Sequence, residues 1–531
     1  MTKHLNILKI LFLIVICGCL WDASVCGQDA LSVTISSIIQ LPKGFSLEDH
    51  VYKDINQDGL KDIVLSVSND GKPFERSLRI YYQKKDNSGF ELEPDEIISL
   101  TTDVVAFACA DVDNNPGAEI LLFTANACFG YRLNQEDKGK IFKIADYEFL
   151  WQIPDSDKVF SWQEAVLDFN NDGRMDFVIP QPEGIKILFQ KDTEFVSTPL
   201  LEVPIENVSN DPNTRFSRNR SSFDFSARFE NRGNAFGGRQ ENKPLVNVNH
   251  SVNVPVFTDC DGDNLYDIVI HSSNCLYVWE QEQKEPFFTN QNINLNISKM
   301  NDKDKKSGSS ENQYVLDLNG DKYFDYLLFK RDQSSKKVFT QILVYLNQKN
   351  SKSNSMSFNA EGIPQQLIKI AGLPGKAKFH DINKDGYPDL SFMIFNPDLL
   401  DQVETLASKS IKLQYLSFFN DKKGLFSRNP DISHEFDVSL EGQNQYGTEP
   451  IQFIIDFNND GLLDVLVRDK SNHIGLRLLK KTKNTIKILD KDVWDMTIPE
   501  DAHIVYEKTD SDLNDVLFIT SPAQIMYVRF K

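Results

Sequence analysis

The sequence predicts an all-β fold, a β-propeller of four-stranded antiparallel blades, from three observations. An acidic nonapeptide recurs seven times along the 531 residues. Each copy lies between two short apolar runs rich in β-branched residues, which is typical of buried strands. The copies start 57 to 91 residues apart, a period typical of solenoids, propellers or arrays of small modules. Room for four strands in each interval favours the propeller.

The seven copies share oxygen-bearing side chains at positions 1, 3, 5 and 9, and we number them loops 1 to 7. In order they are DINQDGLKD (54–62), DVDNNPGAE (111–119), DFNNDGRMD (168–176), DCDGDNLYD (259–267), DLNGDKYFD (317–325), DINKDGYPD (381–389) and DFNNDGLLD (456–464). A loop with this spacing can turn its odd-numbered side chains inward around one hard cation. Ca²⁺ takes roughly 6–8 oxygen ligands in flexible geometry, so four side chains, a backbone carbonyl and water suffice. The pattern therefore predicts up to seven structural Ca²⁺ sites.

Two other interpretations fit an acidic loop. An EF-hand needs Glu at position 12 and a helix on each side, whereas the last acid here is at position 9 and the flanks are strands. Solvated turns without metal are the second alternative, because Asp, Asn and Gly favour turns by themselves. Seven loops at fixed spacing would bring together carboxylates that repel one another without cations, which favours calcium.

The remainder of each unit predicts two further strands. In the first unit, Ser77–Tyr82 is expected as the third strand and Glu91–Leu100 as the fourth. In the fourth unit the corresponding runs are Leu276–Glu280 and Phe287–Ile297. Helical periodicity is limited to a turn or two at Leu399–Lys409. The loop pattern therefore joins strands one and two of each blade.

The pattern D-x-[DN]-x-D-G-x-x-D followed by an apolar strand resembles the FG-GAP/VCBS repeat family. Its members are similar to the integrin α-chain propeller, where such loops hold Ca²⁺ on one face of the blades. The resemblance runs from near Leu31 to the C-terminus and implies side-chain ligands at positions 1, 3, 5 and 9. These are Asp54, Asn56, Asp58, Asp62, Asp111, Asp113, Asn115, Glu119, Asp168, Asn170, Asp172, Asp176, Asp259, Asp261, Asp263, Asp267, Asp317, Asn319, Asp321, Asp325, Asp381, Asn383, Asp385, Asp389, Asp456, Asn458, Asp460 and Asp464.

Three loops depart from this pattern at the glycine of position 6, which supplies the positive φ of a tight curl. Loop 2 has Pro116 there and ends on Glu119, and loops 4 and 5 have Asn264 and Lys322. Asn tolerates a positive φ, whereas Lys does so less readily. Loop 5 is therefore expected to be the least favourable metal site.

The C-terminal residues 502–531 predict a degenerate eighth repeat. Its strand-like runs are Ile504–Tyr506, Asp515–Ile519 and Ile525–Val528. Asp515 takes the place of the ninth-position acid, but the other ligand positions are lost. Leu31–Leu41 is a strand without a blade of its own, and pairing it with Ile525–Val528 would close the ring and remove its open edges. We therefore expect eight blades with seven calcium loops; the integrin resemblance implies seven blades as the alternative.

The composition restricts the function. The net charge is −20, and seven Ca²⁺ ions would bring it to about −6. A nucleic-acid partner is not expected, because it requires a basic surface, and the charge does not favour an anionic membrane surface either.

The N-terminus predicts export. Residues 1–27 are expected to form a signal peptide, with an apolar run at Ile10–Ile16 and cleavage after Gly27. The run is too short to span a bilayer. The alternative is a bacterial lipobox ending at Cys19, which would carry a lipid anchor. The protein is therefore expected to be secreted or at the cell surface, where Ca²⁺ is concentrated enough to fill weak sites.

Four cysteines lie beyond this region, namely Cys109, Cys128, Cys260 and Cys275. An even number in an exported protein suggests disulfides. Within a blade, however, Cys109 and Cys260 are at the loop end of the strands, and Cys128 and Cys275 are at the opposite end. That separation exceeds the Cα distance of about 7 Å that a disulfide allows. Buried free thiols are expected.

Residues 207–243 interrupt the repeat and account for the longest interval. They are rich in Asn, Arg, Ser, Phe and Gly, and carry Arg215, Arg218, Arg220, Arg228, Arg232 and Arg239. This composition predicts a disordered insertion. It is either a tolerated loop or a basic, aromatic arm for an acidic polymer or partner.

No catalytic residue or organic cofactor is predicted. The histidines show no metal-ligand spacing, and neither G-x-S-x-G nor a phosphate-binding glycine loop occurs. The sequence therefore predicts an exported calcium-binding propeller that is not an enzyme, a binding or adhesion scaffold for an extracellular protein or glycan. The alternative is a polysaccharide lyase or hydrolase, or a lectin, on the same frame.

Overall fold

The computed structural model describes residues 33–530 with gaps. The gaps are 70, 72–73, 87, 113–116, 134–137, 148–158, 182–183, 193, 203–205, 208–221, 229–246, 254–255, 272–275, 284–286, 294–311, 333–337, 350–355, 358–362, 397–409, 440–449, 459, 483–484 and 508–515. Five expectations lie outside the described residues: the signal peptide 1–27 with Cys19, the ligands Asp113 and Asn115 of loop 2, the helical turn at 399–409, Cys275, and the degenerate loop that ends at Asp515.

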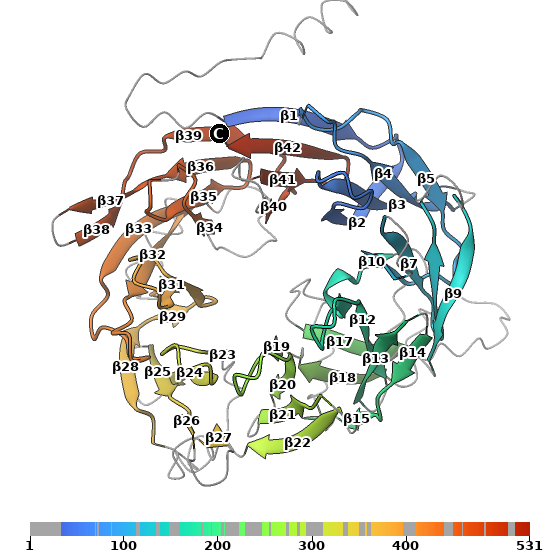
Figure 1. Cartoon of the computed structure of the whole chain (residues 1–531). Coiled ribbons are helices and arrows are strands. Elements are labelled where there is room, and N and C mark those ends of the chain that lie inside the picture. Colours follow the sequence, from blue (N-terminus) through green and yellow to red (C-terminus); the bar gives the residue numbers. More distant parts are fainter. Residues whose placement is uncertain are drawn as a thin grey trace, which may run out of the picture.

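Eight small antiparallel sheets stand around a central axis as the blades of a β-propeller (Figure 1). This confirms the predicted fold and the count of eight, so the seven-bladed alternative is wrong. Each blade has four main strands, and in most blades the first of them lies on the side of the central axis (Figure 1).

The first four blades contain these strands. Blade 1 has β2 (Phe45–Lys53), β3 (Asp62–Asn69), β4 (Arg76–Tyr81) and β5 (Glu96–Ser99). Blade 2 has β6 (Ala106–Ala110), β7 (Glu119–Phe123), β8 (Ala127–Tyr131) and β9 (Ile141–Asp146), with β10 (Phe160–Ser161) parallel to β6. Blade 3 has β11 (Val166–Leu167), β12 (Asp176–Gln181), β13 (Gly184–Lys191) and β14 (Glu194–Ser197), with β15 (Leu201–Glu202) on β13; a 3₁₀ turn, η1 (Gln163–Ala165), precedes β11. Blade 4 has β19 (Val256–Thr258), β20 (Asp267–His271), β21 (Leu276–Gln281) and β22 (Phe288–Ile293).

The second four blades follow the same order. Blade 5 has β23 (Asn312–Leu316), β24 (Asp325–Asp332), β25 (Phe339–Tyr345) and β28 (Gln366–Ala371). Blade 6 has β29 (Leu373–Pro374) and β30 (Lys378–His380), both on β31 (Asp389–Phe395), then β32 (Ser410–Phe418) and β33 (Ile432–Ser439). Blade 7 has β34 (Ile451–Ile455), β35 (Asp464–Lys470), β36 (His473–Arg477) and β39 (Trp494–Thr497). Blade 8 has β40 (His503–Glu507), β41 (Val516–Thr520), β42 (Gln524–Phe530) and β1 (Val33–Gln40).

The ring closes where it was predicted to. β1 pairs antiparallel with β42, from Val33 opposite Phe530 to Gln40 opposite Gln524, with a bulge between Ile35 and Ser37. The N-terminal strand thus completes the blade that the last three strands begin. Closure pairs an edge that the ring would otherwise leave open.

The core lies between neighbouring blades. Successive residues of a strand point to opposite faces of its sheet, and both faces of β3 are covered. Val64 belongs to the apolar cluster shared with blade 2, whereas Ile63 and Leu65 belong to the cluster shared with Phe518 of blade 8. The unbroken apolar runs after each loop are therefore buried on both faces, as predicted.

Part of the insertion is a strand. β17 (Ser222–Arg228) pairs antiparallel with β18 (Asn247–Asn253), which also pairs with β16 (Glu206–Asn207). The expectation of disorder across 207–243 therefore differs from the structure at Asn207, in β16, and at β17; positions 208–221 and 229–243 are outside the described residues. The reason is local, because the run SFDFSAR alternates polar and apolar residues with the two-residue period of a strand.

Two smaller pairs complete the secondary structure. They are β26 (Gln348–Lys349) with β27 (Met356–Ser357) and β37 (Leu479–Thr482) with β38 (Thr485–Ile488). Cys109, Cys128 and Cys260 are free and buried, as predicted. No helix in the described part of the chain is long and apolar enough to cross a membrane.

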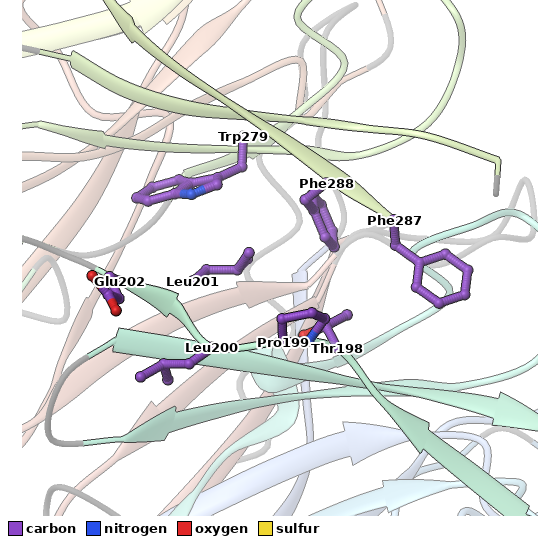
Figure 2. Close-up of a pocket in the computed structure, with 8 residues that line it drawn as sticks. All are labelled: Thr198, Pro199, Leu200, Leu201, Glu202, Trp279, Phe287 and Phe288. Carbon is purple, nitrogen blue, oxygen red and sulfur yellow. The ribbon is translucent and has the colours of Figure 1, made fainter. Parts of the chain in front are cut away.

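A cavity of about 310 Å³, open to solvent on one side, lies between blades 3 and 4 (Figure 2). Residues 198–202 form one wall, and Trp279, Phe287 and Phe288 form the other. The first wall depends on Gly184, because a Cβ there would lie 2.1 Å from the carbonyl oxygen of Leu201. The walls are largely apolar, and Glu202 is the one charged residue among those that line the cavity.

Candidate metal centres

Loops 1 to 7 all connect the first strand of a blade to the second. They follow β2, β6, β11, β19, β23, β30 and β34 and precede β3, β7, β12, β20, β24, β31 and β35. Since the blades share one strand order around the axis, the loops gather at one end of the propeller. The structure therefore brings the predicted ligands of each loop together at one end, except Asp113 and Asn115, which are outside the described residues.

The acid at position 9 is the first residue of the second strand and is buried in all seven loops. One of its oxygens accepts the N–H of position 2 of its own loop, at 2.6–3.1 Å. In six loops the other oxygen accepts an N–H at the end of the third strand, at 2.8–3.2 Å. Position 9 therefore clamps the loop to its blade, beyond its predicted role as a ligand.

Burial raises the pKa values of the six aspartates at position 9, and a bound cation would lower them again. Burial brings the pKa to about 7 for Asp62, Asp176, Asp267, Asp325 and Asp464. The pKa of Asp389 rises to about 6 for the same reason. The backbone N–H bonds oppose this rise, and carboxylates of the same loop add to it. A bound cation would favour the charged form and return the pKa to a low value.

The side-chain oxygens at positions 1, 3 and 5 accept hydrogen bonds from backbone N–H groups of the same loop. Position 1 accepts the N–H of position 6 at 2.8–2.9 Å in every loop but loop 2. Position 5 accepts the N–H of position 7 in the same six loops, at 2.8–3.1 Å. Position 3 accepts the N–H of position 5 in five of them, at 2.9–3.2 Å. These bonds hold the odd-numbered oxygens near one another before any metal binds.

Among the ligand positions that the structure describes, two oxygens are buried and accept no hydrogen bond. They are Oδ1 of Asp54 in loop 1 and Oδ1 of Asn383 in loop 6. A buried acceptor without a donor destabilises the fold by about 1–3 kcal/mol. A cation bound by these oxygens would remove that cost.

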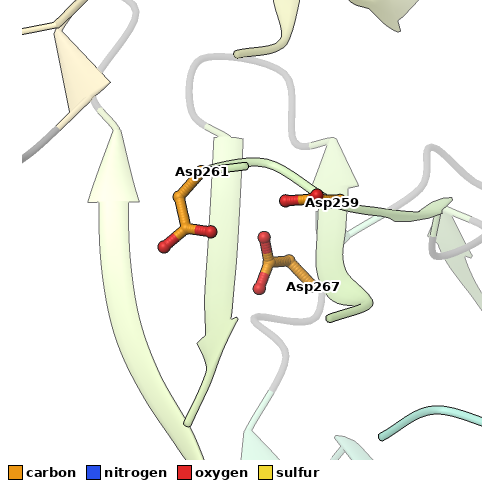
Figure 3. A group of neighbouring side chains, drawn as sticks. All are labelled: Asp259, Asp261 and Asp267. Carbon is orange, nitrogen blue, oxygen red and sulfur yellow. The ribbon is translucent and has the colours of Figure 1, made fainter. Parts of the chain in front are cut away.

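In loop 4, three carboxylates lie close together. Oxygens of Asp259, Asp261 and Asp267 lie within 4.8 Å of one another, and Figure 3 shows the three side chains converging. Three carboxylates at this separation repel one another unless a cation lies among them. The three carboxylates of loop 4 and the unpaired oxygens of loops 1 and 6 are all oxygen donors, which are the ligands of a hard cation such as Ca²⁺.

Positive φ angles occur at position 6, as predicted. The four glycines there have φ of +84° to +92°. Asn264 and Lys322 adopt the same conformation, at +68° and +70°, so Lys322 does not prevent loop 5 from forming. Position 4 also has a positive φ in loops 1, 3, 4, 5 and 6, and in loops 4 and 5 it is the glycine. A non-glycine residue in this region costs roughly 1–2 kcal/mol.

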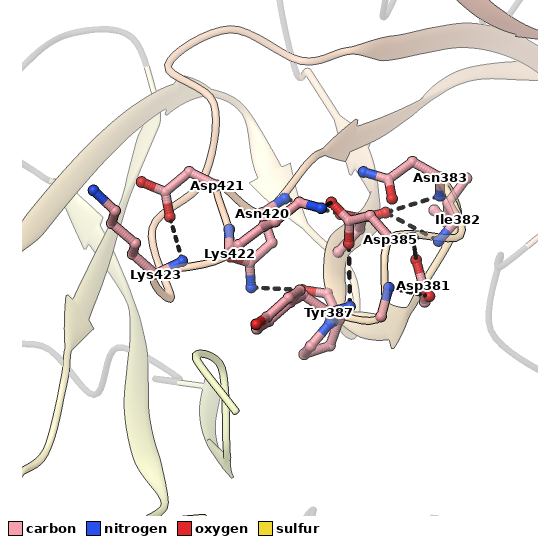
Figure 4. Close-up of polar contacts among 12 residues, drawn as sticks. Asp381, Ile382, Asn383, Asp385, Tyr387, Asn420, Asp421, Lys422 and Lys423 are labelled. Carbon is pink, nitrogen blue, oxygen red and sulfur yellow. Dashed lines mark hydrogen bonds and ion pairs between the residues drawn. The ribbon is translucent and has the colours of Figure 1, made fainter. Parts of the chain in front are cut away.

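A set of Gln and Asn residues at the end of the third strand was not predicted from the sequence. The backbone N–H groups that bind position 9 in loops 1, 3, 4, 5 and 6 belong to Gln83, Gln190, Gln281, Asn347 and Asn420. The side chains of three of them also join neighbouring blades. Gln83 donates to the hydroxyl oxygen of Tyr527 at 3.4 Å, Gln190 to the carbonyl of Val112 at 2.9 Å and Asn420 to that of Leu318 at 2.8 Å. Figure 4 shows Asn420 beside loop 6. A recurring Gln or Asn about 14 to 31 residues after position 9 was the signal.

Comparison with known proteins shows similarity to solved structures only. The sequence matches no protein-family profile and no curated protein. Among solved structures, it is similar to a lectin of Agrocybe aegerita studied for its recognition of non-reducing terminal N-acetylglucosamine (14% identity, 87% of this chain and 99% of the other, TM-score 0.38). It is also similar to a protein from Lactobacillus plantarum (10% identity, 86% and 97%, TM-score 0.31). A third is the Photorhabdus luminescens Tc holotoxin pore (9% identity, 93% and 27%, TM-score 0.21). All three TM-scores are below 0.5, so none of these similarities indicates a function for this chain.

Proposed function

We propose that the protein is an exported, calcium-stabilised β-propeller of the FG-GAP/VCBS type that serves as a binding scaffold for an extracellular protein or glycan. The observation that carries this proposal is the design of the loops. In loops 1 and 3 to 7, where the odd-numbered positions are described, hydrogen bonds within the loop hold the oxygens of positions 1 and 5, and in five loops also of position 3, near a buried position-9 carboxylate. In loops 1 and 6 one oxygen at a ligand position has no donor. No organic cofactor or catalytic residue is part of the proposal.

Calcium would act on stability rather than on chemistry. It would bind the folded loops and not the unfolded chain, so it would stabilise the fold by mass action. Seven ions would reduce the net charge from −20 to about −6. Sites of this kind fill where Ca²⁺ approaches millimolar concentration, as it does outside cells. Export through residues 1–27, with or without a lipid anchor at Cys19, belongs to the same proposal.

The direct test is a binding screen of the full chain against glycans and cell-surface proteins, each with excess Ca²⁺ and with chelator. We expect ligands whose capture requires Ca²⁺, because the loops order the face that presents the binding surface. Calorimetric titration of the metal-free protein should show several equivalents of Ca²⁺. A protein that takes up no Ca²⁺ at millimolar concentration would refute the proposal.

A lectin is the second candidate, and the cavity between blades 3 and 4 favours it over a polysaccharide lyase or hydrolase. Apolar and aromatic walls with few polar groups are typical of small-ligand sites. Glu202, at the exposed edge of β15, could accept hydrogen bonds from a ligand's hydroxyl groups. In a glycan screen, Glu202→Gln and Phe287→Ala should both reduce binding, and Leu489→Ala, a change in an exposed residue outside the cavity, should not. Equal glycan binding by all three variants would exclude this cavity.

A further inference from the structure

We infer that neighbouring cation sites are coupled through position 4 of loops 1, 3, 5 and 6, and that two lysines serve as resident cations which weaken calcium binding by loops 6 and 7. The inference rests on the proposed calcium function and concerns its regulation. It assigns a role to residues outside the predicted ligand set.

Position 4 is where one loop meets the next. In loop 1, Nε2 of Gln57 lies 3.4 Å from Oδ2 of Asp111, the first ligand position of loop 2. In loop 3, Asn171 donates to the carbonyl of Asn264 in loop 4. In loop 5, a Cβ on Gly320 would lie 3.2 Å from the ring of Tyr387 in loop 6. The left-handed backbone turns position 4 away from its own oxygens and toward the neighbouring loop.

Loop 6 places a charge at this point. Its position 4 is Lys384, whose Nζ lies 3.6 Å from Oδ2 of Asp456, the first ligand position of loop 7. The position-4 residues of the other six loops are Gln, Asn or Gly. A Ca²⁺ ion in loop 7 would share this carboxylate with an ammonium group and be repelled by it. In loop 2 the equivalent contact comes from the neutral Gln57, which exerts no such repulsion.

A second ammonium group approaches loop 6 itself. Lys422 follows the third strand of blade 6, and its Nζ lies 3.9 Å from Oδ2 of Asp385 at position 5. Figure 4 shows its segment next to Asp385 and Tyr387. Both lysines have a positive φ, +61° for Lys384 and +67° for Lys422, although Asn adopts that conformation more readily than Lys. Both side chains are about half exposed, so their effect is partly screened.

The experiment is a calcium titration of the metal-free full chain by calorimetry. Lys384→Asn removes the charge and suits the backbone, and Lys384→Arg keeps the charge at the same point. Lys480→Asn removes an exposed lysine from β37 and controls for net charge. We expect Lys384→Asn to tighten one equivalent of Ca²⁺ on the order of threefold to tenfold, the effect of a partly screened unit charge. Lys384→Arg and Lys480→Asn should bind as the wild type does.

Two further variants show which loop binds the Ca²⁺ ion whose affinity changes. With loop 7 disabled by Asp460→Asn, the gain from Lys384→Asn should disappear, and Lys422→Asn should still tighten one equivalent. If the wild type binds several equivalents and Lys384→Asn binds identically, the inference is wrong and the proposed function stands. If the wild type binds no Ca²⁺, both are wrong. Circular dichroism without Ca²⁺ shows whether each variant is folded.

Discussion

Asn420 in blade 6 donates its side-chain N–H to the carbonyl oxygen of Leu318, in loop 5 of the neighbouring blade, at 2.8 Å. Its backbone N–H binds Oδ1 of Asp389, the position-9 acid of loop 6, at 2.9 Å. One residue therefore connects two neighbouring loops. Order imposed on one loop by a cation would be transmitted to the interface between blades, because these bonds leave little freedom to either side.

Asn420→Ala should destabilise the protein more than a surface substitution does. The side chain is buried, donates to two carbonyls and accepts two backbone N–H groups. Loss of these bonds leaves buried groups unpaired, so we expect about 2–3 kcal/mol in the free energy of unfolding, measured by urea denaturation. Asn472→Ala, in the exposed turn before β36, is the control. Equal midpoints for the two variants would contradict the role of Asn420.

Removal of calcium should lower the melting temperature substantially. Each site contributes about 2.7 kcal/mol when free Ca²⁺ is about one hundred times its Kd. Asp168→Ala in loop 3 and Asp456→Ala in loop 7 should each reproduce part of the loss. Asp437→Ala, an exposed carboxylate on β33, should not. Differential scanning fluorimetry with Ca²⁺ and with chelator provides the measurement, and superimposed curves would rule calcium out.

The stability of the metal-free protein should rise as the pH falls from about 7.5 to about 5.5. The six aspartates at position 9, in loops 1 and 3 to 7, have folded-state pKa values of about 6 to 7, above the unfolded value of about 3.9. A raised pKa means that the folded state binds protons more tightly, so stability is lost as the pH rises through 6 to 7 and regained on acidification. Protons compete with Ca²⁺ for these carboxylates, so the stabilisation by calcium should decrease as the pH falls from about 7.5 to about 5.5. Melting temperatures across this range, with and without Ca²⁺, test both signs; a metal-free protein that melts lower at pH 5.5 would contradict the burial argument.

Ring closure should depend on the inward face of β1. Ile39 is 1% exposed and packs between blades 8 and 1, whereas Ile38 is 38% exposed. Ile39→Ala should cost about 2–5 kcal/mol, as for other large core residues, and Ile38→Ala should cost well under half of that. Chemical denaturation of the two variants makes the comparison. Equal losses would mean that β1 does not close the ring through this face.

The repeated parts of this fold were predictable because their signals are local. The loop pattern and the apolar run after it place the first two strands, and the unpaired stretch before Phe45 indicated the closing strand β1. Residues such as Gln57 and Lys384 were not identified, since their contacts join loops 54 to 72 residues apart in sequence and position 4 varies in residue type. β15 was missed for a similar reason: its place on β13 depends on the absence of a side chain at Gly184.

The partner strands β1 and β42 lie at opposite ends of the described chain. During synthesis from the N-terminus, β1 emerges first and finds its partner last, after seven blades have been made. Until then its backbone N–H and C=O groups on the pairing edge have only water, or another chain, to bind. Contacts this distant in sequence form slowly, and an unpaired strand is a route to domain swapping and aggregation. The pairing that closes the ring is thus also the folding step at which misassembly with another chain occurs most readily.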